Sequence, residues 1–276
     1  MSNQKKGLES IARQVCLHEG LKYNGYVASG AFKSTFSAYK DEIQYAVKII
    51  TQPGSARTLR EIQAMQKCSH SNIVNLEHIG TITDSGNEYT YLIEEFLAGG
   101  TLAQQRNLAE LAPTVGKSIS KAINHLHLLG LVHRDIKPDN IMLKESGDVL
   151  LGDLGIVRDL NNTSLTQTWA MMGPGTPLYA SPEQLNNEKH LIDWRSDQFS
   201  LGIVLSFSLF GYHPYSDEGM DDIMIITAVA ERKGASSRFN EDSLGSKYPF
   251  IADMVKPWPV QRFSCSRRLI ELWGEE

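Results

Sequence analysis

The chain has 276 residues, of which 41% are hydrophobic and 21% charged, and its formal net charge is −5. This composition is typical of a soluble globular protein with a substantial core, and its acidic balance argues against a nucleic-acid coat or a polybasic membrane arm. Three scattered cysteines (Cys16, Cys68 and Cys265) without a CxxC pair predict a reducing compartment and neither a disulfide framework nor a zinc site.

The first hundred residues are dominated by strand-like patterns. They follow residues 1–18, whose weak helical spacing predicts either an extra helix packed on the next region or a flexible lead. Five apolar or alternating runs predict strands, and the breaks "KDE" and "DSGN" predict hairpin turns between two pairs of them. The expected strands are residues 21–29, 34–40, 43–50, 73–83 and 88–97. Residues 55–68, with apolar side chains on one face, predict a helix between the third and fourth strands.

The remainder of the chain is mainly helical. Residues 111–130 predict a helix with Pro113 at an early position and Gly130 at its C-terminal cap. The 12-residue apolar run 199–210 is too short for the roughly 20 residues of a membrane span and predicts a buried helix. A β-rich part followed by a helical part indicates an α+β protein with two lobes, and ligands tend to bind in clefts at such junctions.

The segment "HRDIKPDN", residues 133–140, brings together a carboxylate, a cation and an amide. Phosphoryl transfer uses such groups to orient the attacking hydroxyl, to stabilise the moving phosphate and to bind a metal ion. The alternative is a polar surface loop with a proline turn. Eighteen residues after Asp135, Asp153 follows the apolar run "DVLL", and a carboxylate at the end of a strand suits a Mg²⁺ ligand.

Lys48 lies in the apolar strand "YAVKII", on the same face as Ala46 and Ile50. A lysine in this setting is either an edge residue that reaches solvent or a buried ammonium with partners. Glu61, on the predicted helix that follows, is a candidate partner.

Taken in order, these motifs resemble those of the eukaryotic-type (Hanks-type) serine/threonine protein kinases, from about Lys22 to Leu272. The resemblance implies a two-lobed kinase fold, with an N-terminal extension at 1–19, an N-lobe at 20–96 and a C-lobe at 97–276. It also implies roles for individual residues. Lys48 would anchor the α- and β-phosphates and pair with Glu61, Asp135 would be the catalytic base, Lys137 would contact the γ-phosphate, and Asn140 and Asp153 would bind Mg²⁺.

Further matches follow the catalytic motifs. "GTPLYASPE" resembles the substrate-binding loop and the A-P-E motif, with Thr176 and Glu183 at its threonine and glutamate. The resemblance makes Asp197 the residue that braces the catalytic loop and Arg262 the partner of Glu183. Lys137 and Thr176 favour serine/threonine over tyrosine specificity.

The expected nucleotide site departs from the family pattern at two places. "VASGAFKSTF" stands where the glycine loop belongs and places Ala28, Gly30 and Lys33 at its three glycine positions. The backbone of Glu95 to Leu97 would bind adenine above Met142, which puts Glu94 at the gatekeeper position. A carboxylate facing a largely apolar pocket costs free energy unless it is paired, by a nearby polar group or by the adenine amine. In the other alignment the strand is shifted by one residue and Glu94 faces solvent.

The resemblance predicts ATP-dependent transfer of phosphate to Ser or Thr hydroxyls of protein substrates, with Mg²⁺ or alternatively Mn²⁺. Arg134 and Arg158 would bind a phosphate on Thr163, Ser164, Thr166 or Thr168 after autophosphorylation, through a transient homodimer. In the alternative, these four side chains are ordinary loop hydroxyls and Arg134 pairs with another group. We expect a cytoplasmic protein with neither nucleic-acid nor membrane partners.

Two alternative functions differ in chemistry from a protein kinase. The incomplete glycine loop and the "DLG" in place of D-F-G favour a pseudokinase or scaffold, but all five expected catalytic and metal-binding residues are present. A kinase-like small-molecule phosphotransferase generally lacks the substrate-binding loop, the A-P-E glutamate and the "D-x-F-S-L-G" block, each of which is recognisable here.

Overall fold

The computed structural model describes residues 3–30, 33–50, 68–153 and 176–274. They form two compact units. The first contains the described residues up to His70 together with Val74–Leu97, and the second contains Ser71–Ile73 and the described residues from Ala98 onward.

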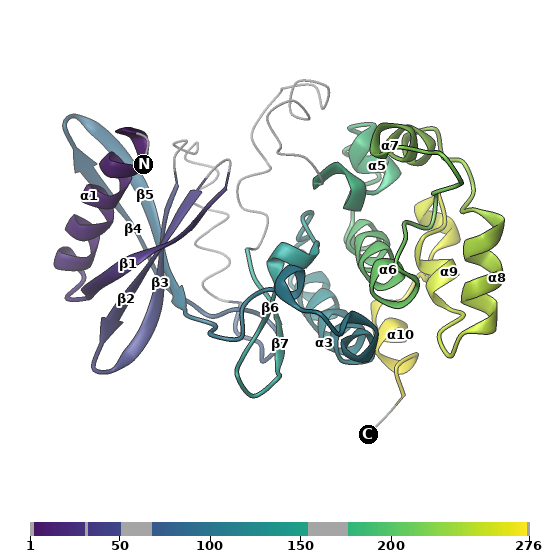
Figure 1. The fold of residues 1–276 in the computed structure, drawn as a ribbon, viewed down its shortest axis with the longest axis horizontal. Coiled ribbons are helices and arrows are strands. Elements are labelled where there is room, and N and C mark those ends of the chain that lie inside the picture. Colours follow the sequence, from purple (N-terminus) through teal and green to yellow (C-terminus); the bar gives the residue numbers. More distant parts are fainter. Residues whose placement is uncertain (1–2, 31–32, 51–67, 154–175, 275–276) are drawn as a thin grey trace. The chain divides into compact units, whose positions relative to one another are not determined.

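The first unit is built on an antiparallel sheet of five strands in the order β1-β2-β3-β5-β4 (Figure 1). The strands are β1 (Lys22–Ser29), β2 (Lys33–Lys40), β3 (Ile43–Ile50), β4 (Leu76–Asp84) and β5 (Asn87–Glu95). Tight turns join β2 to β3 and β4 to β5. The first has positive φ at Asp41 and Glu42 (49° and 67°) and the second at Ser85 and Gly86 (52° and 80°). Positive φ at both central residues matches the twist of the flanking strands. The expected strands and both hairpin turns are confirmed.

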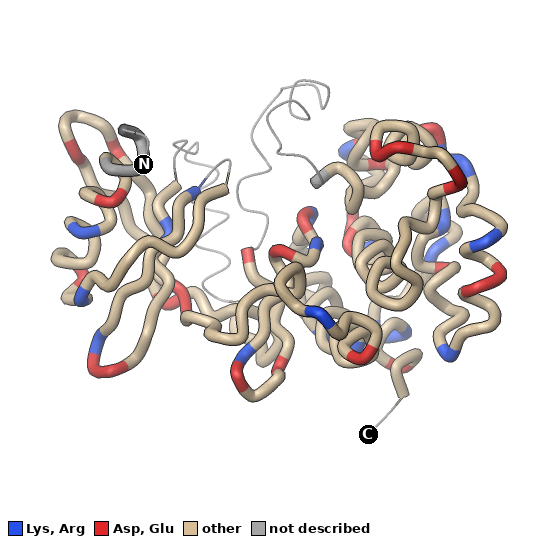
Figure 2. Tube along the Cα trace, viewed as in Figure 1, with Lys and Arg blue, Asp and Glu red and all other residues tan. Residues whose placement is uncertain are grey.

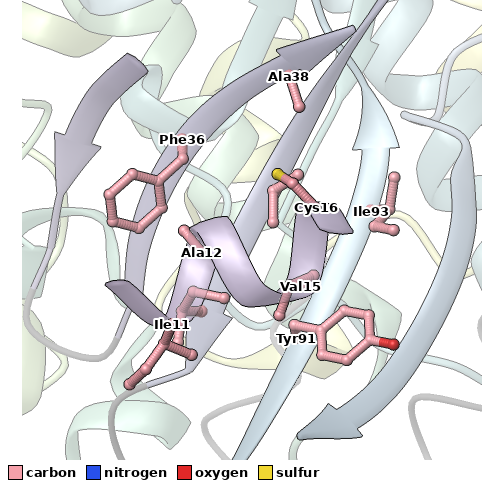
Figure 3. Packing of buried hydrophobic residues seen from close by; sticks show 10 residues of the cluster. Ile11, Ala12, Val15, Cys16, Phe36, Ala38, Tyr91 and Ile93 are labelled. Atoms are coloured by element: carbon pink, nitrogen blue, oxygen red, sulfur yellow. The ribbon is translucent and has the colours of Figure 1, made fainter. Parts of the chain in front are cut away.

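Helix α1 (Asn3–His18) packs on this sheet, which confirms the first of the two expectations for the N-terminal segment. Its apolar face contacts buried side chains of β2, β3 and β5 (Figure 3). This cluster consists of Ile11, Ala12, Val15, Cys16, Phe36, Ala38, Val47, Ile49, Tyr91 and Ile93. Burial raises the pKa of the Cys16 thiol to about 11, so this side chain acts as a small apolar group. The helix expected at 55–68 falls almost entirely outside the described residues.

The described part of the second unit is mainly helical and contains one small hairpin. Its helices are α3 (Leu108–Leu128), α5 (Pro182–Leu185), α6 (Trp194–Phe210), α7 (Asp222–Ala230), α8 (Ser237–Gly245), α9 (Ile251–Met254) and α10 (Ser266–Glu271). The hairpin pairs β6 (Ile141–Leu143) with β7 (Val149–Leu151). The expected early position of Pro113 is wrong, because α3 begins at Leu108 and Pro113 is an interior residue. Gly130 follows the helix at a φ of 70°, as expected of a terminating glycine.

Helix α6 is the centre of the second unit. Asp193 caps its first turn by accepting a hydrogen bond from the backbone N–H of Arg195, and Gly211 ends it in the left-handed conformation. Side chains on every face of this helix are buried, including the polar Ser196, Asp197 and Gln198. The apolar run that it contains is therefore a buried helix, as predicted. Among the described residues, no helix combines the length and apolar character that a membrane span requires.

Charged residues of both signs occur in each unit (Figure 2). The segment leading into α7 is acidic, with Asp217, Glu218, Asp221 and Asp222. Asp221 has a structural role, because its side chain accepts a hydrogen bond from the backbone N–H of Met224 and so caps α7.

Candidate active site

The segment His133–Asn140 lies between α3 and β6 in the chain, and Asp197 of α6 holds its first residues in place. The two carboxylate oxygens of Asp197 accept hydrogen bonds from the backbone N–H groups of His133 and Arg134, at 2.8 and 2.7 Å. Arg134 has a φ of 67°, which is unusual for a residue with a side chain. Burial raises the pKa of Asp197 to about 7, although the two backbone hydrogen bonds oppose this shift. Asp197 thus braces this loop, as expected.

Asp135 lies at the centre of a group of polar side chains on this loop. The Lys137 ammonium is 3.3 Å from Asp135 Oδ2. Asn140 donates from Nδ2 to the backbone oxygen of Asp135 at 2.7 Å and to its Oδ2 at 3.0 Å. These three predicted residues are therefore in direct contact, with a half-buried carboxylate between an ammonium and an amide.

Asp153 follows β7, and backbone contacts tie its segment to the loop. The N–H of Gly152 donates to the carbonyl oxygen of Asn140 at 2.8 Å, and His133 Nε2 lies 2.9 Å from the carbonyl oxygen of Gly152. Asp153 is half-buried and has a φ of 55°. Because Asn140 uses its amide nitrogen toward Asp135, its amide oxygen is the atom that would bind a cation. A carboxylate and an amide oxygen are donors of the type that Mg²⁺ prefers, so these residues fit the ion.

The loop has a second support that the motif analysis did not identify. Gln184, in α5, donates from Nε2 to the carbonyl oxygen of Arg134 at 2.9 Å. Its Oε1 accepts from the backbone N–H and the hydroxyl of Ser181, at 3.2 and 3.0 Å. The sequence signal is the S-P-E-Q capping pattern, in which a glutamine at the third helical position bonds back to the cap. Gln184 thereby fixes the peptide group directly before Asp135.

Glu183 and Arg262 form the ion pair that the sequence comparison implied. The Nη1 and Nη2 atoms of Arg262 donate to the two carboxylate oxygens at 2.7 and 3.0 Å, and both side chains are completely buried. The Ser196 hydroxyl adds a 2.7 Å hydrogen bond to the carboxylate. Burial alone would raise the pKa of Glu183, but the hydrogen bonds and charge of Arg262 outweigh burial and lower it.

In the first unit, Lys48 is a buried ammonium with a partner. Its Nζ lies 2.5 Å from Oε2 of Glu94, and the two side chains are 5% and 8% exposed. Glu94 therefore does not face solvent, and the alignment shifted by one residue is wrong. Glu61, the expected partner of Lys48, lies outside the described residues.

Apart from Met142, the other residues expected at the nucleotide lie on the same sheet or in the segments next to its strands. Ala28 is exposed and pairs with Thr35, and the N–H of Gly30 donates to the carbonyl oxygen of Lys33 at 2.9 Å across the β1–β2 turn. Among the described residues, no atom would lie within 4 Å of a methyl group added to Gly30, so their packing does not require glycine there.

At the end of β5, the side chain of Glu95 accepts a hydrogen bond from the backbone N–H of Asn75 at 3.0 Å, and Leu97 is buried. Met142, the expected floor of the adenine site, lies in β6 of the second unit and is half-buried. The four candidate phosphorylation sites between 163 and 168, Arg158 and the side chain of Thr176 lie outside the described residues.

Comparison with known proteins defines the class. The protein kinase domain model matches residues 22–273. The chain therefore belongs to the protein kinase family, and the expected family and fold class are confirmed. Rad53, in a crystal structure with AMP-PNP, has the same fold, with a TM-score of 0.71 and 24% identity over 93% of this chain and 66% of that chain.

Sequence relatives bear names of serine/threonine kinases. "Probable serine/threonine-protein kinase PknB" of Lactococcus lactis is 36% identical over 168 residues, 59% of this chain and 26% of that protein. A "Probable serine/threonine-protein kinase" of Clostridium perfringens is 28% identical over 236 residues, 84% of this chain and 32% of that protein. "Calcium/calmodulin-dependent protein kinase type 1B" of Rattus norvegicus is 28% identical over 288 residues, 98% of this chain and 77% of that protein. The chain thus spans about a third or less of the two bacterial relatives.

Proposed function

We propose that this chain transfers the γ-phosphate of ATP to Ser or Thr hydroxyls of protein substrates. The observation that carries the proposal is the contact of Asp135 with Lys137 and Asn140, on a loop that Asp197 braces. Asp135 would accept a hydrogen bond from the attacking hydroxyl and orient it, as the aspartate of a kinase catalytic loop does. Lys137 would stabilise the negative charge of the γ-phosphate.

Asn140 and Asp153 would hold Mg²⁺, with Mn²⁺ as an alternative, and the ion would neutralise phosphate charge. Lys48 would anchor the α- and β-phosphates, with Glu61 as its partner. The segment containing Ala28, Gly30 and Lys33 would cover them. At the end of β5 and in the segment that follows it, the backbone of Glu95 and Leu97 would bind adenine. In support, the backbone N–H of Leu97 donates to no backbone carbonyl oxygen among the described residues.

The same proposal divides the chain into an N-terminal extension at 1–19, an N-lobe at 20–96 and a C-lobe at 97–276. It also includes autophosphorylation through a transient homodimer and a cytoplasmic location. Mass spectrometry after incubation with ATP and Mg²⁺ tests autophosphorylation. An active preparation without phosphate at residues 163–168 would refute it.

The central experiment measures transfer of ³²P from ATP to a generic basic protein, followed by identification of the phosphorylated amino acids. We expect phosphoserine or phosphothreonine from the wild-type chain and none from Asp135→Ala. Asp148→Ala removes an exposed carboxylate of the same unit and serves as the matched control. Nucleotide binding without any transfer would favour the pseudokinase, and transfer to small molecules but not to proteins would favour the phosphotransferase.

A further inference from the structure

The ion pair between Lys48 and Glu94 is set by the register of two strands. Lys48 of β3 lies opposite Leu92 of β5, and Ala46 lies opposite Glu94. Lys48 and Glu94 are therefore diagonal neighbours on one face of the sheet, where long side chains can meet. The 2.5 Å separation joins residues that are 46 positions apart in the chain.

Burial makes the pair energetically significant. Both side chains are almost completely withdrawn from water, and Thr90 and Leu92, which share this face of β5, are also buried. Removing one member of a buried pair takes a counter-charge away from the other buried charge, which is unfavourable. Lys48 therefore depends on Glu94 for part of the stabilisation of its charged form.

We infer that Glu94 is a positioning residue for Lys48. It holds the ammonium at a fixed place on β3, in addition to any contribution from Glu61, so that Lys48 can bind nucleotide phosphates. This inference rests on the proposed function, which makes Lys48 a phosphate ligand. An ammonium has three N–H donors, so pairing with one carboxylate oxygen is compatible with phosphate binding.

A carboxylate at this position could have two other roles, and each predicts a different effect of removing Glu94 on ligand binding. If Glu94 bound the adenine amine, its removal would weaken the binding of every adenine compound. If Glu94 withheld Lys48 from the phosphates, its removal would strengthen ATP binding. A positioning role predicts instead a loss that is confined to ligands with phosphates.

The test measures dissociation constants for ATP with Mg²⁺ and for adenosine by calorimetry. The wild-type chain is compared with Glu94→Gln, which has nearly the same shape, and with Glu88→Gln, which removes an exposed carboxylate from the same face of β5. We expect Glu94→Gln to weaken ATP binding on the order of tenfold, as is typical for the loss of one charge-assisted contact, and to leave adenosine binding within about twofold. Glu88→Gln should change neither constant.

The inference would be overturned if Glu94→Gln weakened the binding of ATP and adenosine equally, if it strengthened ATP binding, or if it changed neither dissociation constant. Adenosine binding also reports that the variant is folded. If Glu94→Gln does not fold, Glu94→Asp keeps the charge on a side chain shorter by one methylene and should show a smaller loss of the same kind. A wild-type chain that binds ATP but transfers no phosphate would refute the proposed function, whereas the comparison of ATP with adenosine would still decide the role of Glu94.

Discussion

Substitution of Glu183 by glutamine tests how much the buried pair with Arg262 stabilises the second unit. The glutamine keeps one acceptor oxygen, but it loses the charge and places an amide NH₂ toward a guanidinium N–H. Breaking a buried ion pair costs about 3–5 kcal/mol, and because glutamine retains one acceptor we expect a loss of about 3 kcal/mol. This is a large part of the roughly 5–15 kcal/mol that stabilises a typical domain.

Urea unfolding at neutral pH, followed by tryptophan fluorescence, measures this difference in the free energy of unfolding. The control is Glu271→Gln, which breaks only exposed contacts with Arg267 and Arg268 and should cost less than about 0.5 kcal/mol. A loss below about 1 kcal/mol for Glu183→Gln would refute the reasoning. Because the pKa of Glu183 is lowered in the folded chain, its contribution is present above the ordinary value of 4.5. That contribution is lost as the pH falls through the folded value, so the two proteins should converge in acid.

Three further predictions concern single side chains. Gln184→Leu removes the donor to the Arg134 carbonyl oxygen, a part-buried acceptor that then loses this partner. It should lower kcat about tenfold with KM unchanged in steady-state assays, and an unchanged kcat would exclude a positioning role. Lys33→Gly should leave measurable activity and change mainly the KM for ATP, whereas complete loss would make Lys33 part of the catalytic machinery. Burial lowers the pKa of His213 from 6.5 to about 4. Acidification through this range should therefore cost up to about 3 kcal/mol of stability in the wild-type chain but not in His213→Asn, and parallel pH profiles in urea unfolding would contradict this.

Local features of the fold were predictable from the sequence because they depend on neighbouring residues. Alternating side chains and turn residues predicted the five strands, and an apolar run predicted the buried helix α6. The contacts of Asp135 with Lys137 and Asn140 also arise within one short loop, so the motif itself places the three groups together. Pro113 misled the prediction of where α3 begins, because proline is most common in the first helical turn but also occurs inside helices.

Contacts between distant residues were harder to predict. The Lys48–Glu94 pair depends on the register of β3 against β5, and a shift of one residue would have turned Glu94 away. Gln184 and Arg134 are 50 residues apart, and no local pattern indicates that a helix-capping glutamine also bonds to the catalytic loop. Glu183 and Arg262 are 79 residues apart, and their pairing was foreseen only through the family resemblance.

The packing of α1 on the sheet has a consequence for synthesis of the chain. Helix α1 is synthesised before the strands on which it packs: its partners on β2 and β3 follow soon after it, whereas Tyr91 and Ile93 of β5 follow much later. The hydrogen bond between Glu19 and Tyr91 spans 72 residues. The part of the α1 face that Tyr91 and Ile93 cover therefore stays exposed until β5 has been translated. Closing such a long loop costs chain entropy before any packing compensates for it, which makes this contact a late step in folding. Until then, this part of the helix is exposed apolar surface of the kind that favours aggregation.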